Sequence, residues 1–253
     1  FLPKREDLMV DIATFKRIAD TFTRPRREEY RHYFNGANFL LYSLGQAAAE
    51  KAGDQDLASS FHNQYEMAIE RLRSVADLEL FPVYQKGKLA ELKVRVRNIR
   101  AGHNLPTHLT NIRQVWLEVV ALDEKRKELM VSGRIDEQGK LGPDTRMFGS
   151  EGQDAQNRPA VDPWAVRSLA RMDSIPPQGF RDVYYGIPAS EGGGAVTFEV
   201  RLRYRQASQE VAENFLAARP ADIDLEAVYG LKEIPIMPVV DMVERNAVFD
   251  SRK

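Results

Sequence analysis

The first eighty residues place apolar side chains three and four positions apart, which is the spacing of one face of a helix. This spacing predicts a helix over Arg5–Phe22, a short one over about Phe39–Lys51 and a longer one that follows Gly53. The apolar positions of the longer helix are Leu57, Phe61, Tyr65, Ala68, Leu72, Val75 and Leu80. We expect Pro82 to end it, because proline interrupts helical hydrogen bonding.

From Leu89 the hydrophobic period changes to two, the period of a strand with one buried face. Residues 113–122 are apolar on both faces, which predicts a central strand with residues 129–135 as its hairpin partner. A Gly- and Pro-rich stretch over 142–163 predicts a long loop. We expect further strands over 166–172, 180–187 and 196–204, a helix over 210–218, and an extended end over 234–249.

These elements predict an α+β fold in two parts. Residues 1–82 would form a helical region, and residues 83–253 an antiparallel β-sandwich-like domain with an inserted loop and helix. Several short strands separated by turns at this spacing are typical of a sandwich. No internal repeat is visible in the sequence.

Composition narrows the chemistry that these residues can carry. The 253 residues include no cysteine, so they can hold no disulfide, no thiolate metal site and no covalently attached haem. The 36 basic and 37 acidic side chains nearly balance, which does not favour a nucleic-acid partner. No apolar run is long enough to predict a membrane span. The sequence also lacks the motifs of nucleotide-binding loops, nucleophile elbows and zinc proteases.

Two histidines lie in stretches that can fix a side chain for ligation. His103 lies in the turn Ala101-Gly102-His103-Asn104-Leu105-Pro106-Thr107, between two predicted strands. His32 lies in an aromatic stretch that ends at Asn38, after a basic cluster that includes Arg27 and Arg31. Histidine at such positions is a candidate metal ligand or acid–base group.

Several short motifs, in this order, resemble the C-terminal part of multihaem c-type cytochromes related to cytochrome c-554. They are His32–Asn38, a long helix ending near Ala76, a strand over Leu89–Asn98, Gly102–Thr107, Arg113–Leu117, Ser132–Asp136 and Asp173–Pro177. In that family a cytochrome region with Cys-x-x-Cys-His haem sites precedes this part. The present chain departs from the family there, because it has no cysteine.

The resemblance implies an accessory or docking module of a periplasmic or extracellular multihaem electron-transfer system. Its partner would be a haem-bearing cytochrome region or subunit that holds haem c, and an oligomer is compatible with it. His32, and secondarily His103, would be axial ligands of a partner haem. Arg27 and Arg31 would pair with haem propionates, since arginine suits carboxylates.

Other interpretations remain open at this point. His32 can instead be a surface residue of a turn, and His103 can be a buried structural histidine that bonds to Asn104 or Arg113. His103 and His108 can both face one metal ion, which would favour a metal- or histidine-dependent enzyme. A third interpretation is a non-catalytic module in which the loop from Gly142 to Trp164 grips a peptide or a glycan.

Overall fold

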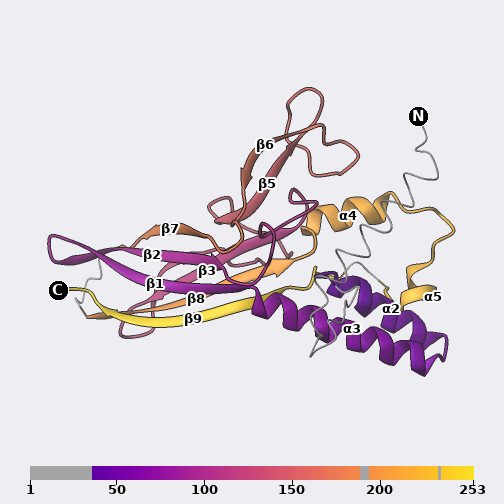
Figure 1. Cartoon of the computed structure of the whole chain (residues 1–253), viewed down its shortest axis with the longest axis horizontal. Coiled ribbons are helices and arrows are strands. Elements are labelled where there is room, and N and C mark those ends of the chain that lie inside the picture. The colour runs from indigo at the N-terminus through magenta and orange to yellow at the C-terminus, as the bar shows by residue number, and fades with distance from the viewer. Residues whose placement is uncertain (1–35, 189–193, 233–234) are drawn as a thin grey trace, which may run out of the picture. The chain divides into compact units, whose positions relative to one another are not determined.

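The computed structural model describes residues 36–188, 194–232 and 235–253, and Asn35–Lys253 form one compact unit (Figure 1). Its helices are α2 (Phe39–Lys51), α3 (Gln55–Ser74), α4 (Gln209–Ala217) and α5 (Leu225–Tyr229). Its strands are β1 (Ala76–Gln85), β2 (Lys88–Asn98), β3 (Gln114–Leu122), β4 (Glu128–Ser132), β5 (Met147–Gln153), β6 (Ser168–Asp173), β7 (Phe180–Gly186), β8 (Ala195–Arg205) and β9 (Val240–Asp250). No helix in this part of the chain is long and apolar enough to cross a membrane.

The strands form two antiparallel sheets. The smaller sheet has the order β1-β2-β7, and the larger one has the order β6-β5-β3-β8-β9, with β4 paired to β3. Strand β3 is central and eight of its nine residues are buried, as its two-faced apolar sequence predicts. The α+β class with a sandwich-like arrangement of sheets is therefore confirmed.

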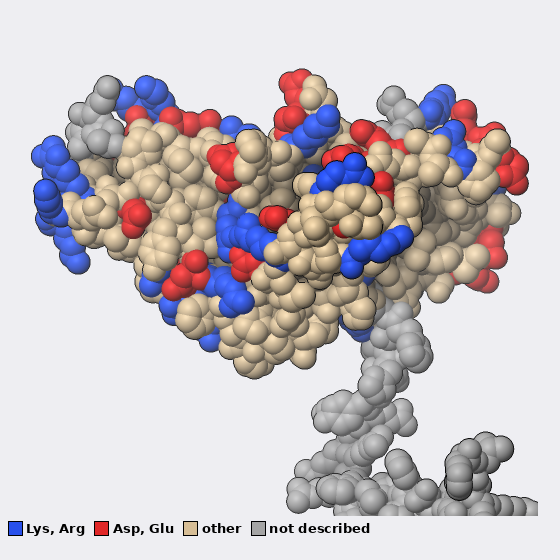
Figure 2. Space-filling model, turned by 90° about the horizontal axis from the view of Figure 1, so that it is seen from above, with Lys and Arg blue, Asp and Glu red and all other residues tan. Residues whose placement is uncertain are grey.

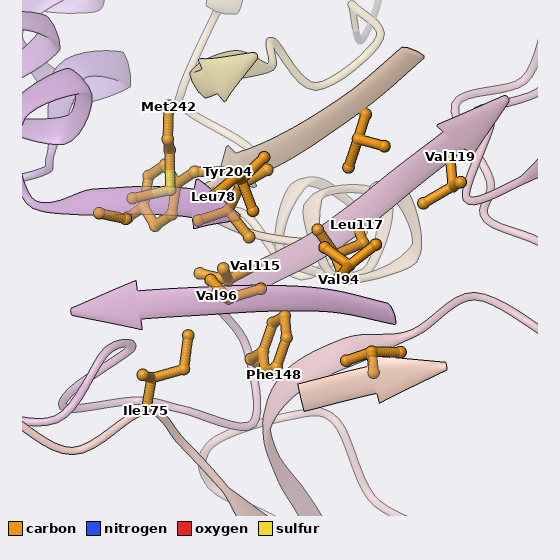
Figure 3. Close-up of a cluster of buried hydrophobic side chains, with 14 of the residues drawn as sticks. Leu78, Val94, Val96, Val115, Leu117, Val119, Phe148, Ile175, Tyr204 and Met242 are labelled. Carbon is orange, nitrogen blue, oxygen red and sulfur yellow. The ribbon is translucent and has the colours of Figure 1, made fainter. Parts of the chain in front are cut away.

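The core lies between the two sheets (Figure 3). Alternate side chains of β2, such as Val94 and Val96, meet Val115, Leu117 and Val119 of β3. Strand β8 contributes every second residue as well, from Val196 to Tyr204. Burial of one side-chain set per strand is the main stabilising term of such a sandwich, at roughly 25 cal/mol per Å² of apolar surface.

The helices share this core instead of forming a separate one. Phe39 of α2 and Leu72 of α3 belong to the same buried cluster as the strands. Phe39 also packs edge-on against Tyr204 of β8, with ring centroids 6.1 Å apart. Helix α3 starts at Asp54, whose carboxylate accepts a hydrogen bond from the Leu57 backbone N–H at 2.9 Å. That bond satisfies one of the unpaired amides of the first turn.

The long helix ends earlier than its apolar spacing predicts. It ends at Ser74 and not at Leu80. The cytochrome resemblance, which implies an end near Ala76, predicts this position better than the apolar spacing does. Residues 76–85 form β1, paired with β2 from Ala76↔Asn98 onward, and the expected division at residue 82 falls within this strand. The spacing of Ala76, Leu78 and Leu80 is compatible with a helix and with a strand. These residues form a strand because they pair with β2, whose apolar and polar residues alternate.

The predicted long loop over 142–163 is also wrong in part, because β5 lies inside it and pairs with β3 and β6. Gly149 and Gly152 interrupt the alternation of apolar and polar residues by which a strand is recognised in a sequence. At Gly149 the backbone has φ 148°, and a Cβ would lie 2.7 Å from the carbonyl oxygen of Thr110. Glycine is required there because the turn before β3 approaches the strand closely. The helix expected over Arg5–Phe22 lies outside the described residues.

Candidate functional site

The turn that carries His103 is held tightly against the sandwich. Leu105 and Ile175 exchange two backbone hydrogen bonds of 2.8 and 2.9 Å, and the Leu105–Pro106 peptide bond is cis. The Asn98 side chain donates to the carbonyl oxygen of His103 at 2.8 Å and accepts from the Ala101 amide at 3.0 Å. The backbone beside His103 is therefore fixed from both sides.

The ring of His103 lies on the surface, so the interpretation of a buried structural histidine is wrong. Its Nδ1 lies 2.8 Å from the carbonyl oxygen of Asn104. A carbonyl can only accept, so Nδ1 is the donor, and in the neutral ring Nε2 then keeps its lone pair. This is the tautomer in which an imidazole ligates a metal through Nε2. Arg113 does not contact this ring.

His103 and His108 do not form a metal site with other ligands. Among the described residues, no group of three or more histidine, cysteine, aspartate or glutamate side chains is close enough to hold a metal ion. His108 is exposed and has a positive φ of 48°. The metal-enzyme interpretation gains no support from this part of the chain. His32, Arg27 and Arg31 lie outside the described residues.

A polar pocket of about 200 Å³ lies between residues 110–113, which connect the turn of His103 to β3, and the strands β5 and β6. We call it the arginine pocket and define it by Thr110, Arg113, Arg146, Ser150, Arg171 and Asp173. The segment that precedes β3 and the strand β5 are joined at its wall. The Ser150 amide donates to the Thr110 carbonyl at 3.1 Å, and the two hydroxyls lie 2.6 Å apart.

Asp173, at the end of β6, is the shared acceptor for three guanidinium groups. Arg146 donates to its Oδ2, Arg171 to the same oxygen at 3.2 Å, and Arg181 to Oδ1 at 3.2 Å. Burial acts to raise the pKa of the Asp173 carboxyl, but the hydrogen bonds from Arg146, Arg181 and Arg171 outweigh it and hold the pKa below its usual value. The carboxylate is thus charged at neutral pH.

This network makes the free energy of unfolding depend on pH. The pKa of Asp173 is lowered on folding, so its stabilisation is present above the unfolded value, about 3.9, and is lost as pH falls through the folded value. We expect Asp173→Asn to cost roughly 1–2 kcal/mol at pH 7, the scale of hydrogen bonds to a charged group.

Denaturant unfolding of both proteins at a series of pH values checks this. The difference in unfolding free energy between them should shrink as the pH is lowered below about 4. A difference that stays constant down to the lowest pH would contradict a role for the ionised carboxylate of Asp173.

Trp164 lies at the end of the expected loop, and its surroundings differ from those of Trp116. Its side chain is 54% exposed and packs edge-on against Phe215 of α4, which is 46% exposed, at 5.2 Å between ring centroids. Trp116 is fully buried in β3, as its two-faced strand predicts. The exposed aromatic pair is the feature of this part of the chain that suits a peptide or a sugar ring.

The sequence analysis missed the residues of the arginine pocket. Arg113, Arg146 and Asp173 are separated by 33 and 27 positions, and each looks like an ordinary charge in a turn or strand. The pairing of Gly149 with Asp173 between β5 and β6 brings two of them together. Two signals were available, Arg113–Leu117 and Asp173–Pro177, which the cytochrome resemblance contains. Arg113 was considered only as a partner of His103, and Asp173 had no role assigned.

No protein-family model matches the chain, and no curated protein matches it either. Among solved structures, it is similar to a penta-heme cytochrome c552 from Thermochromatium tepidum, with a TM-score of 0.51 and 20% sequence identity. The similarity covers 72% of this chain and 41% of that cytochrome, so the chain corresponds to less than half of that protein's length. At this identity the match shows a shared fold.

Proposed function

We propose that the chain is a haem-free module of a multihaem c-type cytochrome system outside the cytoplasm, which docks on a haem-bearing region or subunit. The observation that carries the proposal is the fold similarity to a penta-heme cytochrome over 72% of the chain. It agrees with the order of short motifs from His32 to Pro177.

The absence of cysteine decides how such a module can act. Covalent attachment of haem c needs cysteine, so these residues can contribute a wall or an axial ligand only to a haem that another region holds. The part of the penta-heme cytochrome that this chain does not cover is the larger share of that protein. A haem-bearing partner region is therefore part of the proposal.

The finer proposal concerns the ligand. His103 supports it by geometry, because its ring is exposed and its Nδ1 is bonded to a carbonyl, which leaves Nε2 for iron. His32 is proposed on sequence grounds, with Arg27 and Arg31 as partners for propionates. A histidine ligand and a water-poor wall tune the reduction potential of a haem.

The test uses the full chain bound to its cytochrome partner. We expect the complex to show the absorption of haem c, and its haem-bearing polypeptide to contain Cys-x-x-Cys-His sequences. Replacing the ligand histidine, by His32→Ala or His103→Ala, should change the spectrum and the reduction potential of one haem.

His62→Ala is the matched control, since His62 is an exposed histidine on α3 and should leave both readouts unchanged. If neither His32→Ala nor His103→Ala differs from the control, axial ligation by these two histidines is ruled out. If no haem protein associates with the chain, the docking proposal itself fails.

A second candidate function is a binding module without haem chemistry. The exposed Trp164–Phe215 pair favours it, because aromatic faces at a surface bind sugar rings and peptide side chains. Trp164→Ala would then abolish binding on a glycan or peptide array while leaving any association with a cytochrome intact.

A further inference from the structure

We infer that the arginine pocket binds a carboxylate group carried on a short hydrocarbon chain. The inference goes beyond the proposed function and does not rest on it, because it concerns a pocket within the described residues and is tested on the isolated chain.

The pocket has more hydrogen-bond donors than acceptors. Each guanidinium carries five N–H groups, and three guanidiniums line the pocket, those of Arg113, Arg146 and Arg171. Two of them, Arg146 and Arg171, share the single carboxylate of Asp173, which also accepts from an arginine outside the lining. The other acid of the pocket, Glu151, reaches Arg171 at 3.4 Å. Positive charge and free donors are therefore left over beside an open volume, which is the arrangement that recognises a further anion.

Arg113 is the clearest unsatisfied cation. It forms no ion pair with any residue in the described ranges, and its hydrogen bonds go to neutral oxygens. Nη1 donates to the Thr107 carbonyl at 3.2 Å, and Nη2 lies 3.5 Å from Oδ1 of Asn38. These contacts hold the guanidinium in place without neutralising it, so it is oriented before a ligand arrives.

One further feature of the wall fits a carboxylate ligand. Arg146 stacks over the ring of Phe148, with 5.2 Å between the guanidinium carbon and the ring centroid, which fixes its plane.

The size and the apolar part of the lining indicate what carries the carboxylate. Pro143, Met147 and Phe148 line the pocket together with the charged groups. A volume of about 200 Å³ corresponds to roughly seven waters or one short-chain acid, at about 30 Å³ per water. A carboxylate on a chain of two or three carbons satisfies both the donors and the apolar surface.

The charge pattern around the hairpin argues against a large anionic partner. Figure 2 views the face from which the β5–β6 hairpin projects, and Lys and Arg are interleaved with Asp and Glu over its middle. A polyanion such as nucleic acid needs an extended basic surface. Recognition here is local, at the scale of one carboxylate.

The experiment is a titration of the isolated full chain with propionate, followed by the NMR signals of the arginine side chains and by calorimetry. We expect saturable binding. Arg113→Gln should weaken it about tenfold or more, since the lost bond is charge-assisted. Asp173→Asn should strengthen it, because it removes a negative charge and frees the two lining guanidiniums of Arg146 and Arg171. If Asp173 only held the fold together, Asp173→Asn would not raise the affinity for propionate while Arg113→Gln lowers it.

Arg158→Gln is the matched control, because Arg158 lies on the same hairpin, pairs with Asp154 and is outside the pocket. Arg113→Lys, which keeps the charge, separates loss of binding from loss of folding. The inference is overturned if propionate gives no saturable change, if Arg113→Gln binds as well as the unaltered chain, or if inorganic phosphate binds more tightly than propionate.

The same titration distinguishes two sources of the carboxylate. If the chain in complex with a cytochrome no longer binds free propionate, the pocket is filled by a haem propionate. If binding persists in the complex, the ligand is a free short-chain acid. Both results support a carboxylate site, and failure to find a cytochrome complex leaves the titration of the isolated chain unaffected.

Discussion

Gly133→Ala is expected to destabilise the chain by about 4 kcal/mol or more, which is exceptional for the addition of one methyl group. Gly133 follows β4 with a positive φ of 74°, and a Cβ there would overlap the carbonyl oxygen of Leu117 in the central strand β3. The carbonyl carbon of Leu117 would lie at 3.0 Å. Neither backbone can move away, because β3 is paired on both sides.

Gly53→Ala separates the two causes of this effect. Gly53 has a similar φ of 78° but nothing within 4 Å of the added Cβ, so it measures backbone strain alone, about 1 kcal/mol. Urea unfolding of the three proteins gives the comparison. Equal losses in the two variants would show that β3 and Gly133 do not approach as closely as described.

Trp116→Ala is expected to cost about 3–5 kcal/mol, the usual range for deleting a buried aromatic side chain. Trp116 is fully buried, and its Nε1 donates to the Gly133 carbonyl at 2.9 Å. Trp116→Phe should lose only about 1–2 kcal/mol, because it keeps most of the packing and gives up the hydrogen bond.

Trp164→Ala is the matched control for this prediction. Trp164 is 54% exposed, and its removal should change the unfolding free energy by less than about 1 kcal/mol. The chain has two tryptophans, so the same variant leaves a fluorescence signal from Trp116 alone. A red-shifted, solvent-like emission from it would contradict the burial of Trp116.

The regular elements with one clear period were predictable. The short helix expected over Phe39–Lys51 is α2, and the alternation from Val196 to Tyr204 falls within β8. The strand succeeds because a single burial direction repeats over nine residues. Only Phe39 and Ala49 are buried in α2, whose bounds follow from the turn formers that end at Asn38 and from Gly53. The prediction for residues 76–85 was wrong. Their apolar spacing fits both a helix and a strand, so it gives no local preference, and pairing with β2 makes them a strand.

In the candidate site, too, some features could be predicted from the sequence and others depend on the tertiary structure. The Gly, Asn and Pro around His103 predict a tightly held turn, and hydrogen bonds from Asn98 and Ile175 hold it. The exposure of the ring depends on the register with which Leu105 pairs with Ile175. Leu105 and Ile175 are both buried, and His103 lies on the outside.

By itself, the sequence determined the absence of covalent haem, the α+β class and the central position of β3, because composition and periodicity are properties of the chain alone. Only the tertiary structure decided the arginine pocket and the free Nε2 of His103. Arg113, Arg146 and Asp173 meet through strand pairing, and sequence spacing contains no record of which strands become neighbours.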